Sequence, residues 1–285
     1  MDSTTRPLRS LLYIPASKAR ALEKARQLAA DAIIFDLEDA VAPDEKAAAR
    51  ALLGQEINAG GYGARMRIVR INALSTEWGA DDAAAVLEMG VDAVLLPKVG
   101  GAGDLDALAQ ITGVLPIWAM METPRGMLAA AEIAAHPLCQ GMVMGTNDLA
   151  KEMGTRFRAD RLPLIPALGL CVLAAKAEDI AIIDGVYNAF RDAEGLAREC
   201  EQGCDMGFDG KTLIHPAQLD VANAVFSPSP EGIDLAHRQI AAYEDALAEG
   251  QAVAVVDGQI VENLHVAIAR KTLAKMNAID SLGTE

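Results

Sequence analysis

The feature that most constrains this chain is a repeated alternation of short apolar runs with segments of helical periodicity. The apolar runs lie at residues 11–15, 32–39, 65–72, 93–98, 116–123, 141–149, 180–184 and 210–215. Nearly continuous apolar strands that alternate with helices are typical of a parallel sheet covered by helices. Eight such units within about 225 residues fit a (β/α)8 barrel better than an open doubly wound sheet. We therefore predict an α/β fold of the TIM-barrel type.

The pattern stops at Ser227-Pro-Ser-Pro, which is typical of a linker. We predict a barrel domain at residues 1–226, followed by the linker and a C-terminal segment at 227–285. That segment has helical periodicity at about 231–249 and 261–278, with an Asp257-Gly258 turn between the two helices. It is too small to hold a large core of its own, so we expect it to pack on its own barrel or on a neighbouring subunit.

Charge narrows the classes of partner. The chain of 285 residues has a net charge of −15, which argues against nucleic acid and anionic membranes as general partners. It opens on a polar stretch and has no apolar run near the ~20 residues that span a membrane, so we expect a cytoplasmic protein. One basic region interrupts this pattern, with Glu23 as its single acid: Arg6, Arg9, Lys18, Arg20, Lys24 and Arg26. This region is either a solvated helix face or a contact for a phosphorylated ligand.

Polar residues follow the apolar runs, and in a barrel the carboxyl ends of the strands carry the active site. Glu122 and Asp148 end neighbouring strands, and no His or Cys lies near them in the sequence. Two hard oxygen donors favour Mg²⁺, with Mn²⁺ as an alternative, completed by water and substrate oxygens. The competing interpretation is that Asp148 or Asn147 caps the next helix.

Two basic residues also end strands. Arg70 lies among apolar residues and needs an anionic partner, which is either Glu38 or Asp39, or a substrate carboxylate bound through two hydrogen bonds. Lys98 is either an ion-pair partner of Asp36 or a residue of the site. We expect Glu38, Asp39 and Lys98 to support the residues that bind metal and substrate.

This set of groups suits one kind of chemistry. A metal held by two carboxylates can chelate a 2-keto or 2-hydroxy acid, while Arg70 and the backbone N–H groups near Thr146 and Asn147 bind its charge. The metal then stabilises charge on the substrate oxygen as a carbon–carbon bond forms or breaks. The residues therefore indicate aldol or Claisen chemistry on a pyruvate- or glyoxylate-like fragment.

Several motifs, in order along nearly the whole chain, resemble the citrate lyase β-subunit family. This family lies within the HpcH/HpaI aldolase/citrate lyase superfamily, together with malyl-CoA and citramalyl-CoA lyases. The segments that carry the resemblance are Arg9-Ser-Leu-Leu-Tyr-Ile-Pro, Phe35-Asp-Leu-Glu-Asp-Ala-Val-Ala-Pro, Arg70-Ile-Asn, Leu96-Pro-Lys, Glu122-Thr-Pro-Arg-Gly, Gly145-Thr-Asn-Asp-Leu, Ile183-Asp-Gly-Val-Tyr, Gly207-Phe-Asp-Gly-Lys and Ile214-His-Pro-Ala-Gln.

The resemblance implies a barrel with a C-terminal lid, assembled as a homotrimer or hexamer in which the lid caps a neighbour's site. It places the metal ligands at Glu122 and Asp148, and a carboxylate-binding arginine at Arg70. It also puts Arg20 and Lys24 near the phosphates of CoA. These assignments strengthen the ligand-binding interpretation of the basic region.

The chain departs from the family in its lid. Where CoA-thioester lyases carry a catalytic Asp, this chain has Glu262, in Asp257-Gly-Gln-Ile-Val-Glu-Asn. Glu262 is still a carboxylate and is able to act as a general acid and base. The alternative is that Glu262 is an exposed residue in the first turn of the last helix.

The activity implied is that of a Mg²⁺-dependent carbon–carbon lyase. It would cleave a short 3-hydroxyacyl-CoA thioester, of the citramalyl-CoA or malyl-CoA type, to acetyl-CoA and a 2-keto acid, with no lysine Schiff base. Two other enzymes remain alternatives: a citrate lyase β subunit acting on a carrier-bound citryl thioester, and a CoA-independent class II aldolase. A non-catalytic barrel that binds a metal and a keto acid is the remaining interpretation.

Overall fold

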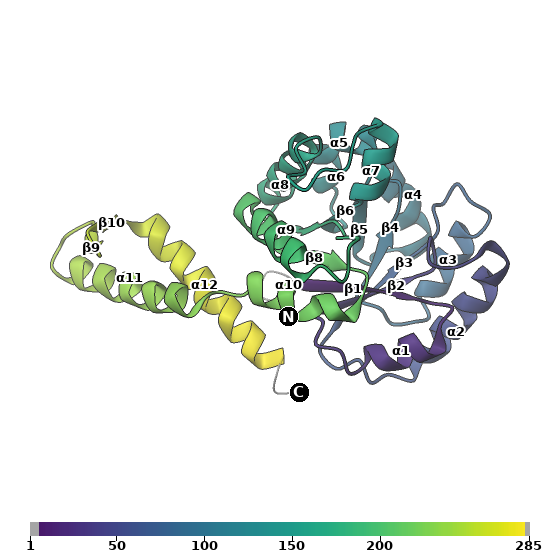
Figure 1. Cartoon of the computed structure of the whole chain (residues 1–285), viewed down its shortest axis with the longest axis horizontal. Helices are drawn as coiled ribbons and strands as arrows, with labels where there is room; N and C mark the ends of the chain where they lie inside the picture. Colours follow the sequence, from purple (N-terminus) through teal and green to yellow (C-terminus); the bar gives the residue numbers. More distant parts are fainter. Residues whose placement is uncertain (1–5, 283–285) are drawn as a thin grey trace. The chain divides into compact units, whose positions relative to one another are not determined.

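The computed structural model describes residues 6–282, which divide into two compact units (Figure 1). The first unit is Leu8–Phe226. Its parallel strands pair in chain order and close into an eight-stranded barrel, which confirms the predicted fold class. The strands are β1 (Ser10–Pro15), β2 (Ala32–Asp36), β3 (Met66–Arg70), β4 (Ala93–Leu96), β5 (Ile117–Met121), β6 (Cys139–Met144), β7 (Ala181–Asp184) and β8 (Gly210–Leu213).

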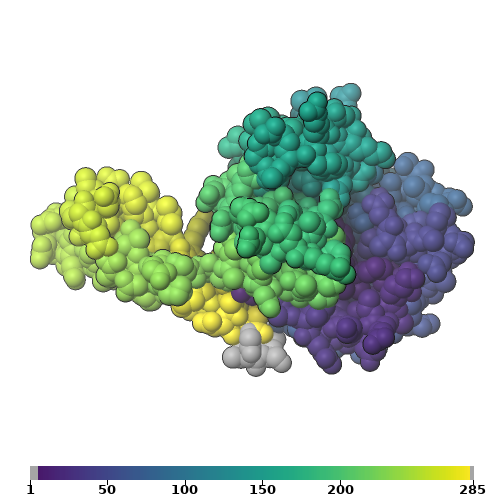
Figure 2. Space-filling model, viewed as in Figure 1, coloured from purple at the N-terminus to yellow at the C-terminus, as the bar shows by residue number. Residues whose placement is uncertain are grey.

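Helices surround the barrel, and successive β/α units form a continuous surface that runs in colour order from purple to green (Figure 2). The helices of this unit are α1 (Ala19–Ala25), α2 (Lys46–Asn58), α3 (Gly79–Val86), α4 (Ala102–Thr112), α5 (Pro124–Leu128), α6 (Ala130–Ala134), α7 (Thr146–Met153), α8 (Ile165–Ala177), α9 (Ala193–Met206) and α10 (Leu219–Val225). Short 3₁₀ turns, η1 (Pro43–Glu45) and η2 (Pro216–Gln218), precede α2 and α10.

The strands are buried on both faces, so the barrel has two apolar layers. In β1, Leu12 and Ile14 join the layer between strands and helices, whereas Leu11 and Tyr13 join the cluster inside the barrel. Trp118, which is 2% exposed, is the largest member of the inner cluster. Its register partner on β6 is Gly141, and a β-carbon there would overlap the indole ring. The absence of a side chain at Gly141 therefore makes room for Trp118.

Two boundaries differ from the prediction. The run predicted as a strand to residue 149 ends at Met144, and α7 begins at Thr146, so Asp148 lies in the first turn of a helix. The polar residues Thr146, Asn147 and Asp148 that follow Met144 are as typical of the end of a barrel strand as of the first turn of a helix, so composition alone does not show the break. The helix predicted at about 124–135 is two helices that meet at Ala129, where the backbone leaves helical geometry at ψ 10°.

The second unit contains residues 227–282 and has a small core of its own. It consists of α11 (Pro230–Ala248), a hairpin of β9 (Ala254–Val256) and β10 (Gln259–Val261), and α12 (Asn263–Leu282). Asp257 and Gly258 join the two strands with φ of 50° and 76°, the positive values that a tight two-residue hairpin turn requires. Among the described residues of both units, no helix is both long and apolar enough to cross a membrane.

A buried ionic cluster joins β7, β8 and α9 of the barrel. Asp184 and Lys211 are fully buried, and Lys211 Nζ lies 3.0 Å from Asp184 Oδ2 and 2.7 Å from Glu199 Oε1. Arg161 Nη1 donates to both oxygens of Asp184, at 2.7 and 2.8 Å. Burial alone would raise the pKa of Asp184, but the charges of Lys211 and Arg161 lower it overall. Lys211 also donates to the Gly185 carbonyl, so the cluster fixes the loop that leaves β7.

Lys211→Met should therefore lower the free energy of unfolding by about 3 kcal/mol, because buried carboxylates lose a cation that they need. Urea denaturation measures this change. Lys176→Met is the matched control, since Lys176 pairs with Asp209 at 2.6 Å on the surface and should contribute less than about 1 kcal/mol. Equal losses in the two variants would contradict the structural role of the buried cluster.

Candidate active site

A cavity of about 320 Å³ lies at the carboxyl ends of the barrel strands. Its lining includes the residues predicted to bind the metal and the acid part of the substrate. Arg20 and Lys24 of α1, which were predicted to contact CoA, do not line it. Polar lining residues are Asp36, Asp39, Arg70, Glu122, Thr146, Asn147 and Asp148, and the others include Tyr13, Pro15, Ala40, Met120, Met144, Gly145, Val186 and Ile214. Strands from all round the barrel thus direct ionisable side chains to one place.

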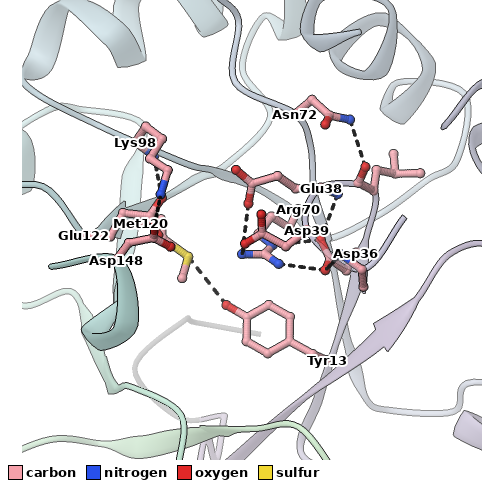
Figure 3. A network of polar contacts seen from close by, with 12 residues as sticks. Tyr13, Asp36, Glu38, Asp39, Arg70, Asn72, Lys98, Met120, Glu122 and Asp148 are labelled. Atoms are coloured by element: carbon pink, nitrogen blue, oxygen red, sulfur yellow. Dashed lines mark hydrogen bonds and ion pairs between the residues drawn. The ribbon is translucent and has the colours of Figure 1, made fainter. Parts of the chain in front are cut away.

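The ammonium group of Lys98 lies between Glu122 and Asp148 (Figure 3). Lys98 Nζ is 2.8 Å from Asp148 Oδ1 and 3.5 Å from Glu122 Oε1. The backbone N–H of Lys98 donates to the same Glu122 oxygen, at 2.8 Å. The structure therefore brings the two predicted metal ligands together around one positive charge.

The sheet register sets the position of this pair. Met121 at the end of β5 pairs with Met144 at the end of β6, so the residues that follow, Glu122 and Gly145, lie side by side. A β-carbon at Gly145 would overlap the Glu122 side chain, so only glycine leaves room for this carboxylate. Asp148 is three residues further on, in the first turn of α7.

Charge and burial balance each other at these groups. Burial raises the pKa of Glu122, and the positive charge of Lys98 offsets part of that rise. Burial also lowers the pKa of Lys98, but its hydrogen bond to Asp148 and the charges of Glu122 and Asp148 outweigh this and raise it overall. Lys98 therefore remains a cation in the pH range in which enzymes work.

Arg70 is the centre of the second charged group of the cavity, to the right of Lys98 in Figure 3. Asp36 and Arg70 are register partners on β2 and β3, and Arg70 Nε and Nη2 donate to the two Asp36 oxygens at 2.8 and 2.7 Å. Arg70 Nη1 lies 2.9 Å from Glu38 Oε2 and 3.5 Å from Asp39 Oδ2. The guanidinium also lies over the Tyr13 ring, with Arg70 Cζ 4.9 Å from its centroid.

These contacts resolve two alternatives from the sequence. Asp36 is the main carboxylate partner of Arg70, beside Glu38 and Asp39, and it occupies the Nε–Nη2 edge that was a candidate for binding a substrate carboxylate. The prediction that Lys98 pairs with Asp36 is wrong, because Arg70 already neutralises Asp36 through the strand register. Lys98 belongs to the Glu122 and Asp148 group instead.

Glu38 is a buried carboxyl beside this ion pair. Burial raises its pKa to about 8, and the neighbouring Arg70 lowers it only in part because Asp36 already pairs with that guanidinium. Glu38 Oε2 is close to Arg70 Nη1 but accepts no well-directed hydrogen bond from the described residues. The carboxyl of Glu38 therefore holds its proton to a higher pH than an exposed glutamate does.

Thr146 and Asn147 are the first two residues of α7, where backbone N–H groups lack partners within the helix. Thr146 is 6% exposed and packs beside Gly185, at which a β-carbon would lie 2.6 Å from Thr146 Oγ1. The Asn147 side chain forms reciprocal hydrogen bonds with Asn188, at 3.1 and 2.8 Å. The side-chain amide of Asn147 is thus committed to the loop after β7. The N-cap residue of α7 is Gly145, and no side chain caps this helix. The interpretation that Asn147 or Asp148 is the cap is therefore wrong.

Three predicted residues are exposed. Arg20 and Lys24 lie on α1 without an ion-pair partner among residues 6–282. Glu262 lies in the second unit, directly before α12, and its backbone N–H donates to His265 Nδ1 at 3.0 Å. The roles assigned to these three residues remain predictions.

Tyr13 is a cavity residue that was not predicted from the sequence. Its hydroxyl donates to Met120 Sδ at 3.5 Å, and burial raises the pKa of Tyr13. The available signal was the period of two along residues 11–14, which puts Leu11 and Tyr13 on one face of β1 and Leu12 and Ile14 on the other. A strand that is apolar on both faces hides this signal.

The donor set fits Mg²⁺. Among the described residues, no cluster of three or more His, Cys, Asp or Glu side chains is arranged to hold a metal, so the pair Glu122 and Asp148 is the relevant set. Mg²⁺ commonly binds one or two carboxylates and keeps several waters or substrate oxygens. The position of the Lys98 ammonium demonstrates that one cation contacts both carboxylates.

Comparisons with known proteins find similar chains over nearly the whole length of this one. The family model HpcH/HpaI aldolase/citrate lyase matches residues 9–216. A (3S)-malyl-CoA thioesterase of Cereibacter sphaeroides strain KD131 is 66% identical over 279 residues, 98% of each chain. The citrate lyase subunit beta of Leuconostoc mesenteroides subsp. cremoris is 33% identical over 290 residues, 96% of each chain. A crystal structure of CitE from Mycobacterium tuberculosis with magnesium, acetoacetate and coenzyme A is 31% identical, with a TM-score of 0.81 and coverage of 96% of this chain and 99% of the other.

Glu38→Gln should become more stable relative to the wild type as the pH rises from 6 to 9. The carboxyl has a higher pKa in the fold, about 8, than in the unfolded chain. Its contribution to stability is therefore complete below the unfolded pKa and is lost as the pH rises through 8. We expect the melting temperature of Glu38→Gln minus that of the wild type to increase by about 2–4 °C across this range.

Differential scanning fluorimetry at several pH values measures this difference. Exposed Glu152→Gln is the control for loss of a surface carboxylate. A Glu38→Gln difference that stays constant or decreases with pH would show that Glu38 is ionised throughout.

Proposed function

Because the chain belongs to the HpcH/HpaI aldolase/citrate lyase family, we propose that it is a Mg²⁺-dependent enzyme acting on a malyl-CoA-type thioester. The observation that carries this proposal is the pair Glu122 and Asp148, held around a single positive charge at the floor of the cavity. A malyl thioester offers such a metal site a carboxylate and an adjacent hydroxyl. Structural neighbours with magnesium and small keto acids support the same ligand class.

We assign hydrolysis of the thioester as the main reaction. The support is the 66% identity over 98% of both chains to a (3S)-malyl-CoA thioesterase. In this reaction the oxygen of water bonds to the thioester carbon, the carbon–sulfur bond breaks, and the CoA sulfur takes up a proton. The products are malate and free CoA.

Carbon–carbon cleavage to acetyl-CoA and glyoxylate, a 2-keto acid, is the second candidate. It is the reaction expected from the sequence, and the match to a citrate lyase subunit beta favours it. Both reactions begin from the same bound thioester. They differ in whether a water molecule reaches the thioester carbon or the bond between the two halves of the malyl group breaks.

Different residues of the barrel would bind the metal and the carboxylate of the substrate. Glu122 and Asp148 would hold Mg²⁺, which supplies positive charge to the oxygens of the malyl group. The N–H groups of Thr146 and Asn147 would donate to its carboxylate at the N-terminus of α7. Arg70, positioned by Asp36, adds a fixed positive charge on the opposite wall. Together these groups orient the substrate and neutralise its carboxylate.

The CoA portion and the proton transfer are assigned to residues outside the cavity. Arg20 and Lys24 are exposed and have no ion-pair partner among the described residues. They would contact the CoA phosphates and so provide a local positive charge in an otherwise acidic protein. Glu262 would exchange the proton in either reaction, in place of the lid Asp of related lyases. This assignment rests on the position of Glu262 in the sequence, as does the proposed homotrimer or hexamer with a lid from one subunit.

The wild-type enzyme, given (3S)-malyl-CoA and Mg²⁺, should release free thiol and malate in equal amounts without glyoxylate. A thiol reagent measures CoA, phenylhydrazine detects glyoxylate, and chromatography identifies acetyl-CoA. EDTA should abolish the reaction. Glu122→Gln and Asp148→Asn should each lower kcat/KM by about a hundredfold or more, because each removes a ligand of the metal.

The exposed Glu152→Gln is again the surface control and should keep the activity of the wild type. Acetyl-CoA and glyoxylate as the main products would replace hydrolysis by the lyase reaction. Turnover that survives EDTA and both substitutions would exclude the metal site. No reaction with malyl-CoA, together with cleavage of free 4-hydroxy-2-keto acids, would exclude the CoA thioester as substrate.

Glu262→Gln should lower kcat by more than about tenfold, equivalent to about 1.4 kcal/mol in the barrier, while KM changes little. The reason is that the amide keeps the size of the side chain but cannot exchange a proton. Steady-state kinetics with malyl-CoA measure this, and exposed Glu249→Gln in the same unit is the control. A loss smaller than tenfold would remove Glu262 from the proton transfer.

A further inference from the structure

Lys98 contacts both proposed metal ligands with two different groups. Its backbone N–H donates to Glu122 Oε1, and its side-chain Nζ lies 2.8 Å from Asp148 Oδ1 and 3.5 Å from Glu122 Oε1. Neither proposed reaction requires an amine, since no Schiff base forms. The ammonium group therefore needs another explanation.

The backbone of Lys98 is fixed in a strained conformation. Its φ is 56°, a left-handed value that costs a residue with a β-carbon roughly 1 kcal/mol or more. The next residue is held too, because the Thr123 hydroxyl donates to the Val99 carbonyl at 3.2 Å, and Gly126 packs against that carbonyl. Movement of Lys98 is thus confined to its side chain.

The side chain, in contrast, has access to water. It is 35% exposed, whereas that of Glu122 is 1% exposed and that of Asp148 is 29% exposed. The ammonium group is able to leave the carboxylates for solvent without crossing the protein core. Lys98 therefore combines a backbone held by its neighbours with an ammonium group that solvent can reach.

The electrostatics of the cavity require a cation at this place. Two cations, Arg70 and Lys98, face four carboxylates at the cavity, Asp36, Asp39, Glu122 and Asp148, beside the carboxyl of Glu38, whose pKa burial raises to about 8. Arg70 is paired with the carboxylates of β2 and the loop after it and acts on Glu122 only from a distance, so Lys98 is the cation that contacts both Glu122 and Asp148. Without it, these two carboxylates would repel each other in a partly buried site.

The Lys98 ammonium and a metal ion exclude each other. Mg²⁺ binds oxygen ligands at about 2.0–2.1 Å. An ion that contacted both carboxylates would take the place between them where the ammonium now lies 2.8 Å from Asp148 Oδ1. Two positive charges so close together would also repel each other strongly.

We propose that Lys98 is a built-in substitute for the metal, which holds Glu122 and Asp148 together in the metal-free enzyme and moves to solvent when Mg²⁺ binds. This inference rests on the metal site of the proposed function. It gives Lys98 a positioning role: the carboxylates are already in place when the metal arrives, at the cost of competition for the site. Metal affinity is therefore lower than the two carboxylates alone would provide.

Isothermal titration of Mn²⁺ into the EDTA-treated full chain, without substrate, tests this proposal. Lys98→Gln, which removes the charge, should bind Mn²⁺ about tenfold more tightly than the wild type. Lys98→Arg keeps a cation and should restore weaker binding. Lys98→Gly removes the charge and relieves the left-handed backbone, so it replaces Lys98→Gln if that variant does not fold. Lys176→Gln, which breaks the surface pair with Asp209, is the control.

Thermal melting provides the second readout. The metal-free Lys98→Gln variant should melt below the wild type, and saturating Mg²⁺ should remove that difference because binding stabilises the folded state. Equal or weaker Mn²⁺ binding by Lys98→Gln, while the wild type binds Mn²⁺, would overturn the role of Lys98 and leave the metal site intact. No Mn²⁺ binding by the wild type or by any Lys98 variant would overturn the metal site and the role of Lys98 together.

Discussion

The repulsion between Glu122 and Asp148 is the constraint on which the site depends. Two carboxylates, one directly after β5 and one in the first turn of α7, stay together only with a cation between them, and here the Lys98 ammonium supplies it. Glu122 is almost fully buried, so it has little help from water. The same requirement that makes the pair costly makes it a strong site for a divalent ion, and this connects the electrostatics of the fold to the proposed chemistry.

The barrel meets this constraint by fixing backbone positions rather than by flexible side chains. Strand register places Glu122 beside Gly145 and Asp36 opposite Arg70. Beside β6, the buried Asp184–Lys211 pair holds the loop after β7, whose Gly185 packs against Thr146. Charged groups that lie outside the reaction thus hold the backbone on which the site is built, and a weaker register at any of these points would separate the site groups.

The sequence was sufficient to predict the barrel, since eight apolar runs with helices between them leave few other folds. It also placed Glu122 and Asp148 at the same end of the barrel, although Asp148 lies in the first turn of α7 and not at the end of β6. The partner of Arg70 was harder, because Asp36, Glu38 and Asp39 lie within four positions and only the register selects Asp36. Lys98 was left open between a pair with Asp36 and a place in the site, and the structure selects the site. The start of α7 was set too late because Thr146, Asn147 and Asp148 also suit the polar end of a barrel strand. These failures share one cause: sequence shows which residues end a strand, whereas register and backbone geometry decide which of them meet.

A crystal structure of the protein with Mn²⁺ and glyoxylate, with anomalous data collected at the manganese edge, tests the central claim most directly. The account predicts one anomalous peak between Glu122 and Asp148, within about 2.3 Å of an oxygen of each, with glyoxylate completing the coordination. Lys98 Nζ should have moved away from Asp148 Oδ1, from which it is now 2.8 Å distant. A peak elsewhere, or Lys98 still in place between the two carboxylates while metal is bound, would contradict it.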